Sequence, residues 1–307
     1  MSGIATWFVI NFVATYICIL GNKAIFASLD FPFGIAVTTC HLLVTMVWTN
    51  FYDATPISGN VKFSSVQWML VCFGMGCGVP LANLSMKHNT LGFYQLAKVT
   101  VLPVTLVLQY AVFAKTVTAK QLVCCVMICV GMVIVIEESI ELSTIGLSTA
   151  MGASLLTAAT QILQQHLQLK HKINSNQLMT SISSGSLGFA VVSMFAIEDV
   201  RAVGAAFFAH ERRFVLGVAL LSTSMCGCFV NLSIAKLVGK TSPITYQVYS
   251  FVKQLVVVIS GRILYDTDTL TTAKVVGSAI TLVFALLYSI DLGALAFFRK
   301  RLSATPD

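Results

Sequence analysis

The chain has 307 residues, of which 57% are hydrophobic and only 10% are charged. Soluble domains carry about 25% charged residues, so this composition excludes a soluble protein and is typical of a membrane protein. No connection between the apolar segments is long enough for a soluble domain, which excludes an enzyme with a separate catalytic domain. We therefore expect no enzymatic activity, no cofactor and no metal site.

Ten apolar segments follow one another along the chain, and most approach the ~20 residues that cross a bilayer as a helix. They cover residues 4–20, 32–52, 66–86, 91–113, 119–136, 145–165, 177–197, 214–235, 243–264 and 275–297. The sequence therefore predicts an all-α membrane protein, with ten transmembrane helices in a single domain over residues 1–307. The first segment lacks the basic start and small-residue cleavage site of a signal peptide, so we expect a retained span.

The basic residues indicate the orientation. On the side that carries both termini there are ten: Lys62, Lys115, Lys120, Lys170, Lys172, Lys236, Lys240, Arg299, Lys300 and Arg301. On the opposite side there are seven: Lys23, Lys87, Arg201, Arg212, Arg213, Arg262 and Lys274. Because cytosolic loops are enriched in lysine and arginine, both termini are expected in the cytosol. The excess of basic residues is a topology signal and gives no evidence for nucleic-acid binding.

The nine cysteines all fall within the predicted spans: Cys18, Cys40, Cys72, Cys77, Cys124, Cys125, Cys129, Cys226 and Cys228. None forms the Cys-x-x-Cys pair that indicates a metal or redox site. We expect them to be free thiols that pack as small apolar side chains.

In the first three spans the polar and small residues predict packing features. Gly21 precedes Lys23, which indicates either a helix that ends at the glycine with a snorkelling lysine, or a lysine at the entrance to the membrane interior. His41 in the second span is expected to be a packing residue. Gly74 and Gly78 have the spacing that lets membrane helices approach closely.

Two tripeptides match the glycosylation sequon but lie inside spans, where no glycan could be attached. They are Asn83-Leu84-Ser85 and Asn231-Leu232-Ser233. We interpret both as polar contacts within the membrane. Pro80, close to the first of them, removes a backbone donor from its helix, and nearby polar side chains can bond the carbonyl that this frees.

Two lysines lie inside the membrane, and such residues are functional by default because burying an ammonium is costly. Lys98 follows Tyr94 by four residues in the fourth span, which Pro103 interrupts. In the ninth span Lys253 follows Tyr249 by the same interval, so each pair shares a helix face. Each pair could be a structural cation–π contact; the alternative is that the lysines bind an anionic substrate.

The ninth span also has a clear beginning. Ser242 is a good N-cap, and Pro243 suits the first position of a helix. The positive end of the helix dipole and Lys253, about three turns further on, would both favour negative charge.

The two halves of the chain resemble each other. Asn-Leu-Ser at 83–85 precedes Tyr94-Gln95 and Lys98, and Asn-Leu-Ser at 231–233 precedes Tyr246-Gln247 and Lys253, with somewhat different spacings. Repeating a unit of five spans gives two halves of opposite orientation, as in many secondary transporters. We predict inverted repeats over about residues 1–140 and 141–307, with a site near the midplane between them.

The seventh span is unusually rich in hydroxyl groups near its start: Thr180, Ser181, Ser183, Ser184 and Ser186. Such groups either bond their own helix backbone or line a polar cavity. The sequence leaves both interpretations open.

From Asn83 onward the chain resembles the nucleotide-sugar and triose-phosphate translocators of the drug/metabolite transporter superfamily. The resemblance rests on 83–85, 88–98, 231–234 and 241–246, together with Asn22-Lys23. It covers nearly the whole chain and implies ten spans, cytosolic termini and substrate phosphates held by lysines in spans four and nine. Those positions correspond here to Lys98 and Lys253.

Residue 254 bears on the substrate. Triose-phosphate carriers have Lys-Arg at the span-nine position and a branch of nucleotide-sugar carriers has Lys-Thr, whereas this chain has Lys253-Gln254. Without the arginine a bidentate phosphate ligand is missing, which disfavours a sugar-phosphate substrate. The Phe-Tyr-Asn-Asn and Gly-Ala-Leu-Asn-Lys motifs of GDP-mannose carriers are also absent, so UDP-sugars are favoured by elimination.

The resemblance therefore implies an antiporter in the Golgi or ER membrane that exchanges a nucleotide sugar for a nucleoside monophosphate. A carrier of small phosphorylated metabolites and a non-transporting receptor or scaffold stay open as alternatives, as does a homodimer. The candidate substrate-binding residues are Lys98, Lys253, Gln254, Tyr94, Gln95, Tyr246, Gln247, Tyr249, Asn83 and Asn231.

Overall fold

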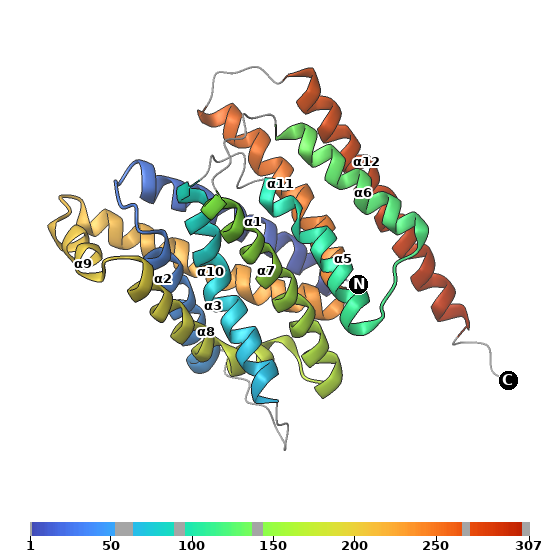
Figure 1. The fold of residues 1–307 in the computed structure, drawn as a ribbon, viewed down its shortest axis with the longest axis horizontal. Coiled ribbons are helices and arrows are strands. Elements are labelled where there is room, and N and C mark those ends of the chain that lie inside the picture. Colours follow the sequence, from blue (N-terminus) through green and yellow to red (C-terminus); the bar gives the residue numbers. More distant parts are fainter. Residues whose placement is uncertain (1, 53–63, 89–95, 137–143, 266–270, 303–307) are drawn as a thin grey trace. The chain divides into compact units, whose positions relative to one another are not determined.

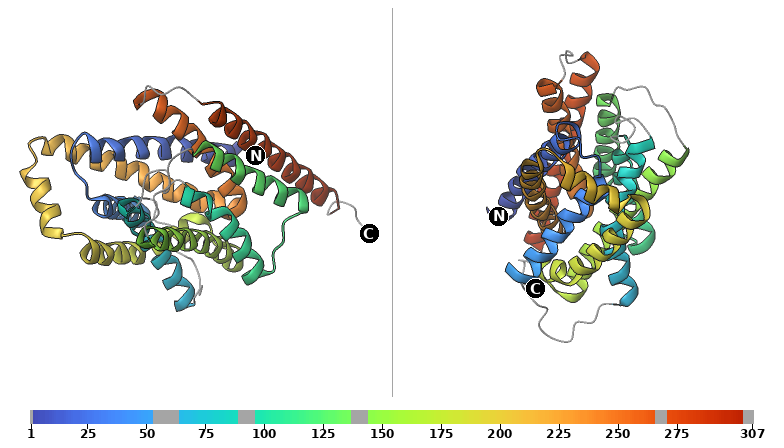
Figure 2. Two further views of the ribbon diagram at one scale, coloured as in Figure 1. Left: turned by 45° about the horizontal axis from the view of Figure 1, so that its top comes forward. Right: turned by 90° about the vertical axis from the view of Figure 1, so that its left-hand side faces the viewer.

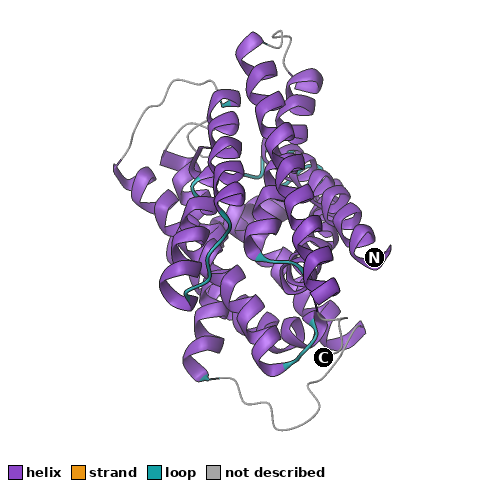
Figure 3. Cartoon of the chain, turned by 90° about the vertical axis from the view of Figure 1, so that its right-hand side faces the viewer, coloured by secondary structure: helices purple, strands orange, loops and turns teal. Residues whose placement is uncertain are grey.

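A computed structural model of the chain describes residues 2–52, 64–88, 96–136, 144–265 and 271–302. Helices make up all the regular structure in these ranges, and no strand occurs there (Figure 3). The prediction of an all-α fold is thus confirmed for the described part of the chain. Seven helices in it are long and apolar enough to cross a membrane.

Each of the ten predicted segments coincides with helical structure. The first five correspond to α1 (Ser2–Ala27), α2 (Gly34–Val47) with the π-helix η1 (Trp48–Tyr52), α3 (Ser65–His88), residues 96–99 with α5 (Val101–Phe113), and α6 (Ala119–Val135). The last five correspond to α7 (Thr144–His171), α8 (Ser175–Ile197), α10 (Arg213–Lys240), α11 (Pro243–Tyr265) and α12 (Thr272–Leu302).

One further helix, α9 (Val200–Ala209), lies in the connection after α8, where the sequence indicated no element. Its first turn is capped by Asp199, whose carboxylate accepts hydrogen bonds from the backbone N–H groups of Arg201 and Ala202. Its apolar side packs through Val203 and Phe207 on a buried cluster around Ile25 and Leu216. The helix is too short to span a bilayer, so a search for ~20-residue apolar segments misses it.

The chain forms two compact units. Unit 1 comprises Met1–Asn89 and Leu142–Tyr246, and unit 2 comprises Thr90–Glu141 and Gln247–Asp307. In unit 1, α1 lies along α10, α3 packs on α7 and α8, and α2 packs on α8 and α10 (Figures 1 and 2). In unit 2, α6 runs beside α12 (Figure 1).

Glycines permit the closest helix approaches in unit 1. A Cβ atom on Gly74 of α3 would collide with the hydroxyl group of Thr160 of α7, as the predicted packing role requires. Gly78 is less tightly enclosed, with Leu156 Cβ 3.8 Å from such an atom. Gly76 faces α8 instead, where a Cβ would lie 2.7 Å from the Phe189 side chain. The glycine-rich stretch of α3 therefore serves two neighbouring helices.

The interpretation of Gly21 as a helix stop is wrong. Helix α1 continues through it to Ala27, and Lys23 is an exposed residue within the helix. A Cβ on Gly21 would collide with the methyl group of Thr223 on α10. The glycine is needed for close packing between two helices that lie far apart in the sequence, rather than for a left-handed cap.

Both sequon-like tripeptides make the polar contacts that we predicted. The Ser85 hydroxyl donates to the Gly146 carbonyl at 2.9 Å, which ties α3 to α7. The buried Asn11 amide donates to the Ser233 hydroxyl at 2.7 Å, which ties α1 to α10. Hydrogen bonds of this kind contribute to association between helices inside a membrane.

The hydroxyl groups of α8 mostly bond backbone carbonyls of their own helix. Thr180, Ser181 and Ser186 donate to the carbonyl four residues earlier, at 2.8–3.0 Å. Ser183 instead lies 3.0 Å from the Thr49 hydroxyl and accepts a bond from the Asn50 amide at 3.1 Å. The backbone interpretation holds for most of the set, and Ser183 joins α8 to the π-helix η1.

The carboxylate of Glu198, the residue directly after α8, caps α2. The two Glu198 oxygens accept hydrogen bonds from the backbone N–H groups of Ile35 and Ala36, both at 2.9 Å. These donors belong to the first turn of α2, where backbone N–H groups lack helical partners and the dipole favours negative charge. The Glu198 side chain and the first turn of α2 are more than 160 residues apart in the sequence, so this cap depends on the tertiary fold.

All nine cysteines are free thiols, as predicted. Cys72 and Cys228 belong to the main buried cluster of unit 1, beside Leu178 and Leu232. They therefore act as small apolar packing residues there.

Candidate functional site

Helix α11 begins as the sequence predicts and places Lys253 in a buried position. Pro243 is its first residue, and the backbone N–H of Thr245 donates to the Ser242 hydroxyl at 3.0 Å. This is the expected N-cap geometry, in which a serine oxygen satisfies a backbone donor of the first turn. Lys253 follows with a side chain that is only 4% exposed.

The surroundings of Lys253 include an aromatic ring and a second cation. Its Nζ atom lies 5.1 Å from the centroid of the Tyr249 ring, one helical turn earlier. Lys98, an exposed residue of the helical turn 96–99, is close enough for its charge to act on that of Lys253. Both predicted lysines thus belong to unit 2, although 155 positions separate them in sequence.

The helix that carries Lys98 is broken directly after it. Residues 96–99 are helical, Thr100 forms a turn, and α5 starts at Val101. Both the backbone N–H and the side-chain hydroxyl of Thr100 donate to the Ala97 carbonyl. Pro103 has no N–H to donate to residue 99 and its ring crowds the preceding turn, which explains the break. Discontinuous helices near buried charges are typical of transporter binding sites.

The remaining candidate residues fall into three groups. Gln247 is buried, and Tyr249 and Gln254 are half-buried, all on α11 in unit 2, whereas Tyr246 is buried and belongs to unit 1. Asn231, also in unit 1, donates from its amide to the Thr45 hydroxyl at 3.1 Å, which links α10 to α2. Tyr94, Gln95 and the side chain of Asn83 lie outside the described residues.

The sequence did not single out the polar cluster at η1, which joins Asn50, Thr49 and Ser183. A π-helix often marks a functional position. Two signals in the sequence point to it: the hydroxyl-rich start of the seventh span, which includes Ser183, and the Thr-Asn pair before the end of the second apolar segment. Within the described ranges, no group of three or more His, Cys, Asp and Glu side chains could hold a metal ion.

Membrane-length helices with lysines inside predicted spans, one of them next to a helix break, are typical of a membrane transporter. The chain belongs to the triose-phosphate transporter family, because the model described as Triose-phosphate Transporter family matches residues 2–289. The resemblance noted in the sequence is thereby confirmed. Since this family consists of transporters, the prediction that the chain is not an enzyme is confirmed as well.

Several relatives from Arabidopsis thaliana are similar over most of their length. UDP-xylose transporter 1 is 30% identical over 285 residues, which cover 90% of this chain and 80% of the relative. UDP-xylose transporter 2 is 27% identical, with coverages of 92% and 78%. UDP-rhamnose/UDP-galactose transporter 1 is 24% identical, with coverages of 94% and 83%.

A solved crystal structure has a similar fold. Its TM-score is 0.69 over 96% of this chain and 99% of that chain, at 8% sequence identity. At this identity the likeness concerns the fold alone.

Proposed function

We propose that the protein is an antiporter that moves a UDP-sugar into the Golgi or ER lumen in exchange for a nucleoside monophosphate. The observation that carries the proposal is the buried position of Lys253 in unit 2, the same unit that contains Lys98. The similarity to UDP-xylose and UDP-rhamnose/UDP-galactose transporters supports the choice of substrate.

The two lysines match the charge of the substrate. A sugar-nucleotide diphosphate carries about two negative charges, and two ammonium groups that lie near each other offer two positive ones. Tyr249, whose ring lies against Lys253, orients the ammonium group. We assign phosphate binding to Lys98 and Lys253. Nucleoside and sugar contacts are assigned to the other candidates: Tyr94, Gln95, Gln254, Tyr246, Gln247, Asn83 and Asn231.

The same charges account for exchange. Without an anion, the ammonium groups of Lys98 and Lys253 repel each other, and the burial of Lys253 strengthens this repulsion. An empty site is therefore costly during the change between outward-facing and inward-facing states, whereas either nucleotide neutralises it. A carrier of this design returns faster when it is loaded with the monophosphate product.

We also propose ten spans in two inverted five-helix repeats, and the division into units supports this arrangement. The first half supplies α1, α2 and α3 to unit 1, and the second half supplies α7, α8 and α10. Unit 2 receives α5 and α6 from the first half, and from the second half α12 and most of α11. Each half thus gives three predicted spans to one unit and two to the other, with the short helix α9 in addition in unit 1.

Helix pairings within each unit support the same repeat. In the proposed repeat, α1, α2 and α3 of the first half correspond to α7, α8 and α10 of the second half. The pairing of α1 with α10 therefore corresponds to the pairing of α7 with α3, and both pairings occur. The pairing of α3 with α8 likewise becomes that of α10 with α2. Ser85 and Ser233, in the two Asn-Leu-Ser tripeptides, bond across the first two of these counterpart interfaces.

A substrate panel tests the proposed function. The purified chain in proteoliposomes is expected to take up UDP-xylose, UDP-galactose or another UDP-sugar at least about tenfold faster than GDP-mannose or triose phosphate. Protein-free liposomes give the background, and liposomes with the Lys98→Ala variant give the matched control. Preferential uptake of triose phosphate in exchange for inorganic phosphate would replace the proposal with the sugar-phosphate alternative.

A further inference from the structure

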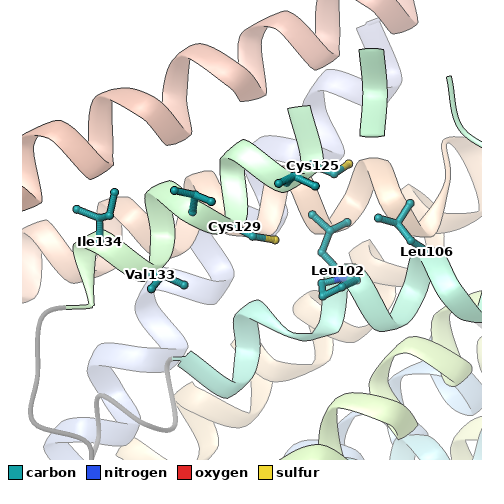
Figure 4. Close-up of a pocket in the computed structure, with 9 residues that line it drawn as sticks. Leu102, Leu106, Cys125, Cys129, Val133 and Ile134 are labelled. Atoms are coloured by element: carbon teal, nitrogen blue, oxygen red, sulfur yellow. The ribbon is translucent and has the colours of Figure 1, made fainter. Parts of the chain in front are cut away.

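Helices α5 and α6 of unit 2 enclose an apolar groove of about 350 Å³, within the range of small-molecule sites (Figure 4). The labelled side chains that line it are Leu102 and Leu106 of α5, and Cys125, Cys129, Val133 and Ile134 of α6. Leu102 and Cys125 are almost fully buried, whereas Val130, which also lines the groove, is 42% exposed. The groove therefore has a closed floor and an open side, and both helices belong to predicted membrane spans.

Two exposed lysines lie at one end of the helix pair. Lys115 follows the end of α5, and Lys120 is in the first turn of α6. Thr118 caps α6 between them and donates to the Asp291 carboxylate at 3.3 Å, so one acid accompanies the two cations. This end of the helix pair therefore keeps a net positive charge, and Lys120 lies five residues before the first groove residue of α6, Cys125.

We propose that the groove holds an acyl chain of an anionic phospholipid whose phosphate is bound by Lys115 and Lys120. From Lys120 to Cys129 the helix rises about 14 Å at 1.5 Å per residue. One leaflet contributes half of the ~30 Å hydrocarbon thickness, so these residues span one leaflet. A lipid with its headgroup at the lysines thus has its chain beside Cys125 and Cys129.

The lining and the lysines together select this occupant. Apolar walls accept the hydrocarbon chain of any lipid, but the two cations distinguish an anionic headgroup from a zwitterionic one. A sterol would leave both lysines unused. A second copy of the chain would have to place an apolar side chain in the groove and an acidic group at the two lysines, with the same distance between them as in a phospholipid.

The test uses the full-length purified chain in mixed micelles. Phosphatidylserine with a photoactivatable group in its acyl chain is cross-linked, and the labelled peptides are identified by mass spectrometry. We expect labelling within residues 101–135, at least about fivefold stronger than with the matching phosphatidylcholine probe. Val130→Trp, which fills the groove, should remove this labelling. Val123→Trp, on the same helix and 55% exposed but outside the groove, should not.

Charge variants complete the test. Lys115→Gln and Lys120→Gln are each expected to weaken phosphatidylserine labelling about fivefold, whereas Lys240→Gln, an exposed lysine at the end of α10, has no effect. Equal labelling by the two lipids, or labelling that survives Val130→Trp, would overturn the proposal. So would displacement of the probe by cholesterol irrespective of the lysines, or cross-linking to a second copy of the chain.

Discussion

Replacing Lys253 with alanine is expected to weaken UDP-sugar binding by ~10–100-fold. The variant loses a charge-assisted contact to phosphate worth roughly 1.5–3 kcal/mol, and each 1.4 kcal/mol corresponds to a factor of ten in affinity. The melting temperature without ligand should stay the same or rise, because the substitution removes a charge from a side chain that is only 4% exposed. Both quantities are measurable on the solubilised protein by thermal denaturation with and without UDP-sugar.

Two controls separate the binding role of Lys253 from a structural one. Tyr249→Phe keeps the ring against the ammonium and should bind UDP-sugar nearly as well as the unmodified chain. Lys240→Ala removes an exposed charge and should change neither quantity. If Lys253→Ala instead lowers the melting temperature sharply and preserves the shift with UDP-sugar, Lys253 is a structural ion-pair residue, whose loss costs roughly 3–5 kcal/mol.

The substitution Gly131→Ala is expected to destabilise the protein by about 1–3 kcal/mol, the usual cost of overpacking. Gly131 of α6 faces Gly277 of α12, and a Cβ added to it would lie 2.7 Å from the Gly277 carbonyl oxygen. That oxygen already accepts a hydrogen bond from the Thr281 hydroxyl, 2.9 Å away. Because the obstacle is backbone of a packed helix, relief requires α6 and α12 to separate. The melting temperature in detergent should fall accordingly.

Gly188 provides the matched control for this prediction. It also lies inside a helix, α8, but nothing would come within 4 Å of an added Cβ. Alanine is favoured over glycine inside a helix by about 1 kcal/mol, so Gly188→Ala should leave the melting temperature unchanged or raise it. Gly277→Ala should behave like Gly131→Ala, since its Cβ would lie 2.6 Å from the Gly131 carbonyl oxygen. Equal effects at Gly131 and Gly188 would rule out the close helix crossing.

The helices were largely predictable from the sequence because a bilayer imposes a fixed length of apolar chain on each span. Local signals also sufficed at the start of α11, where Ser242 and Pro243 act within a single turn. Lysines inside apolar spans are costly in a membrane wherever they occur, so Lys98 and Lys253 could be identified without knowledge of the fold. Their closeness within unit 2 required the structure.

The features that the sequence did not predict depend on residues far apart in the chain. Whether Gly21 ends α1 is decided by Thr223 of α10, and the partner of Glu198 is the first turn of α2. No local pattern encodes either contact. Helix α9 was missed for a different reason, because its apolar face is too short to resemble a span and is recognisable only against the cluster around Ile25.

Exchange across the membrane is the most direct test of the central claim. Proteoliposomes containing the purified chain are loaded with UMP, with GMP or with buffer alone, and the initial uptake of labelled UDP-sugar is measured. We predict that UMP inside accelerates uptake at least tenfold over empty vesicles, that GMP has a much smaller effect, and that Lys253→Ala abolishes the acceleration. Equal initial rates in loaded and empty vesicles would contradict the account, because the paired lysines would then impose no requirement for a returning anion.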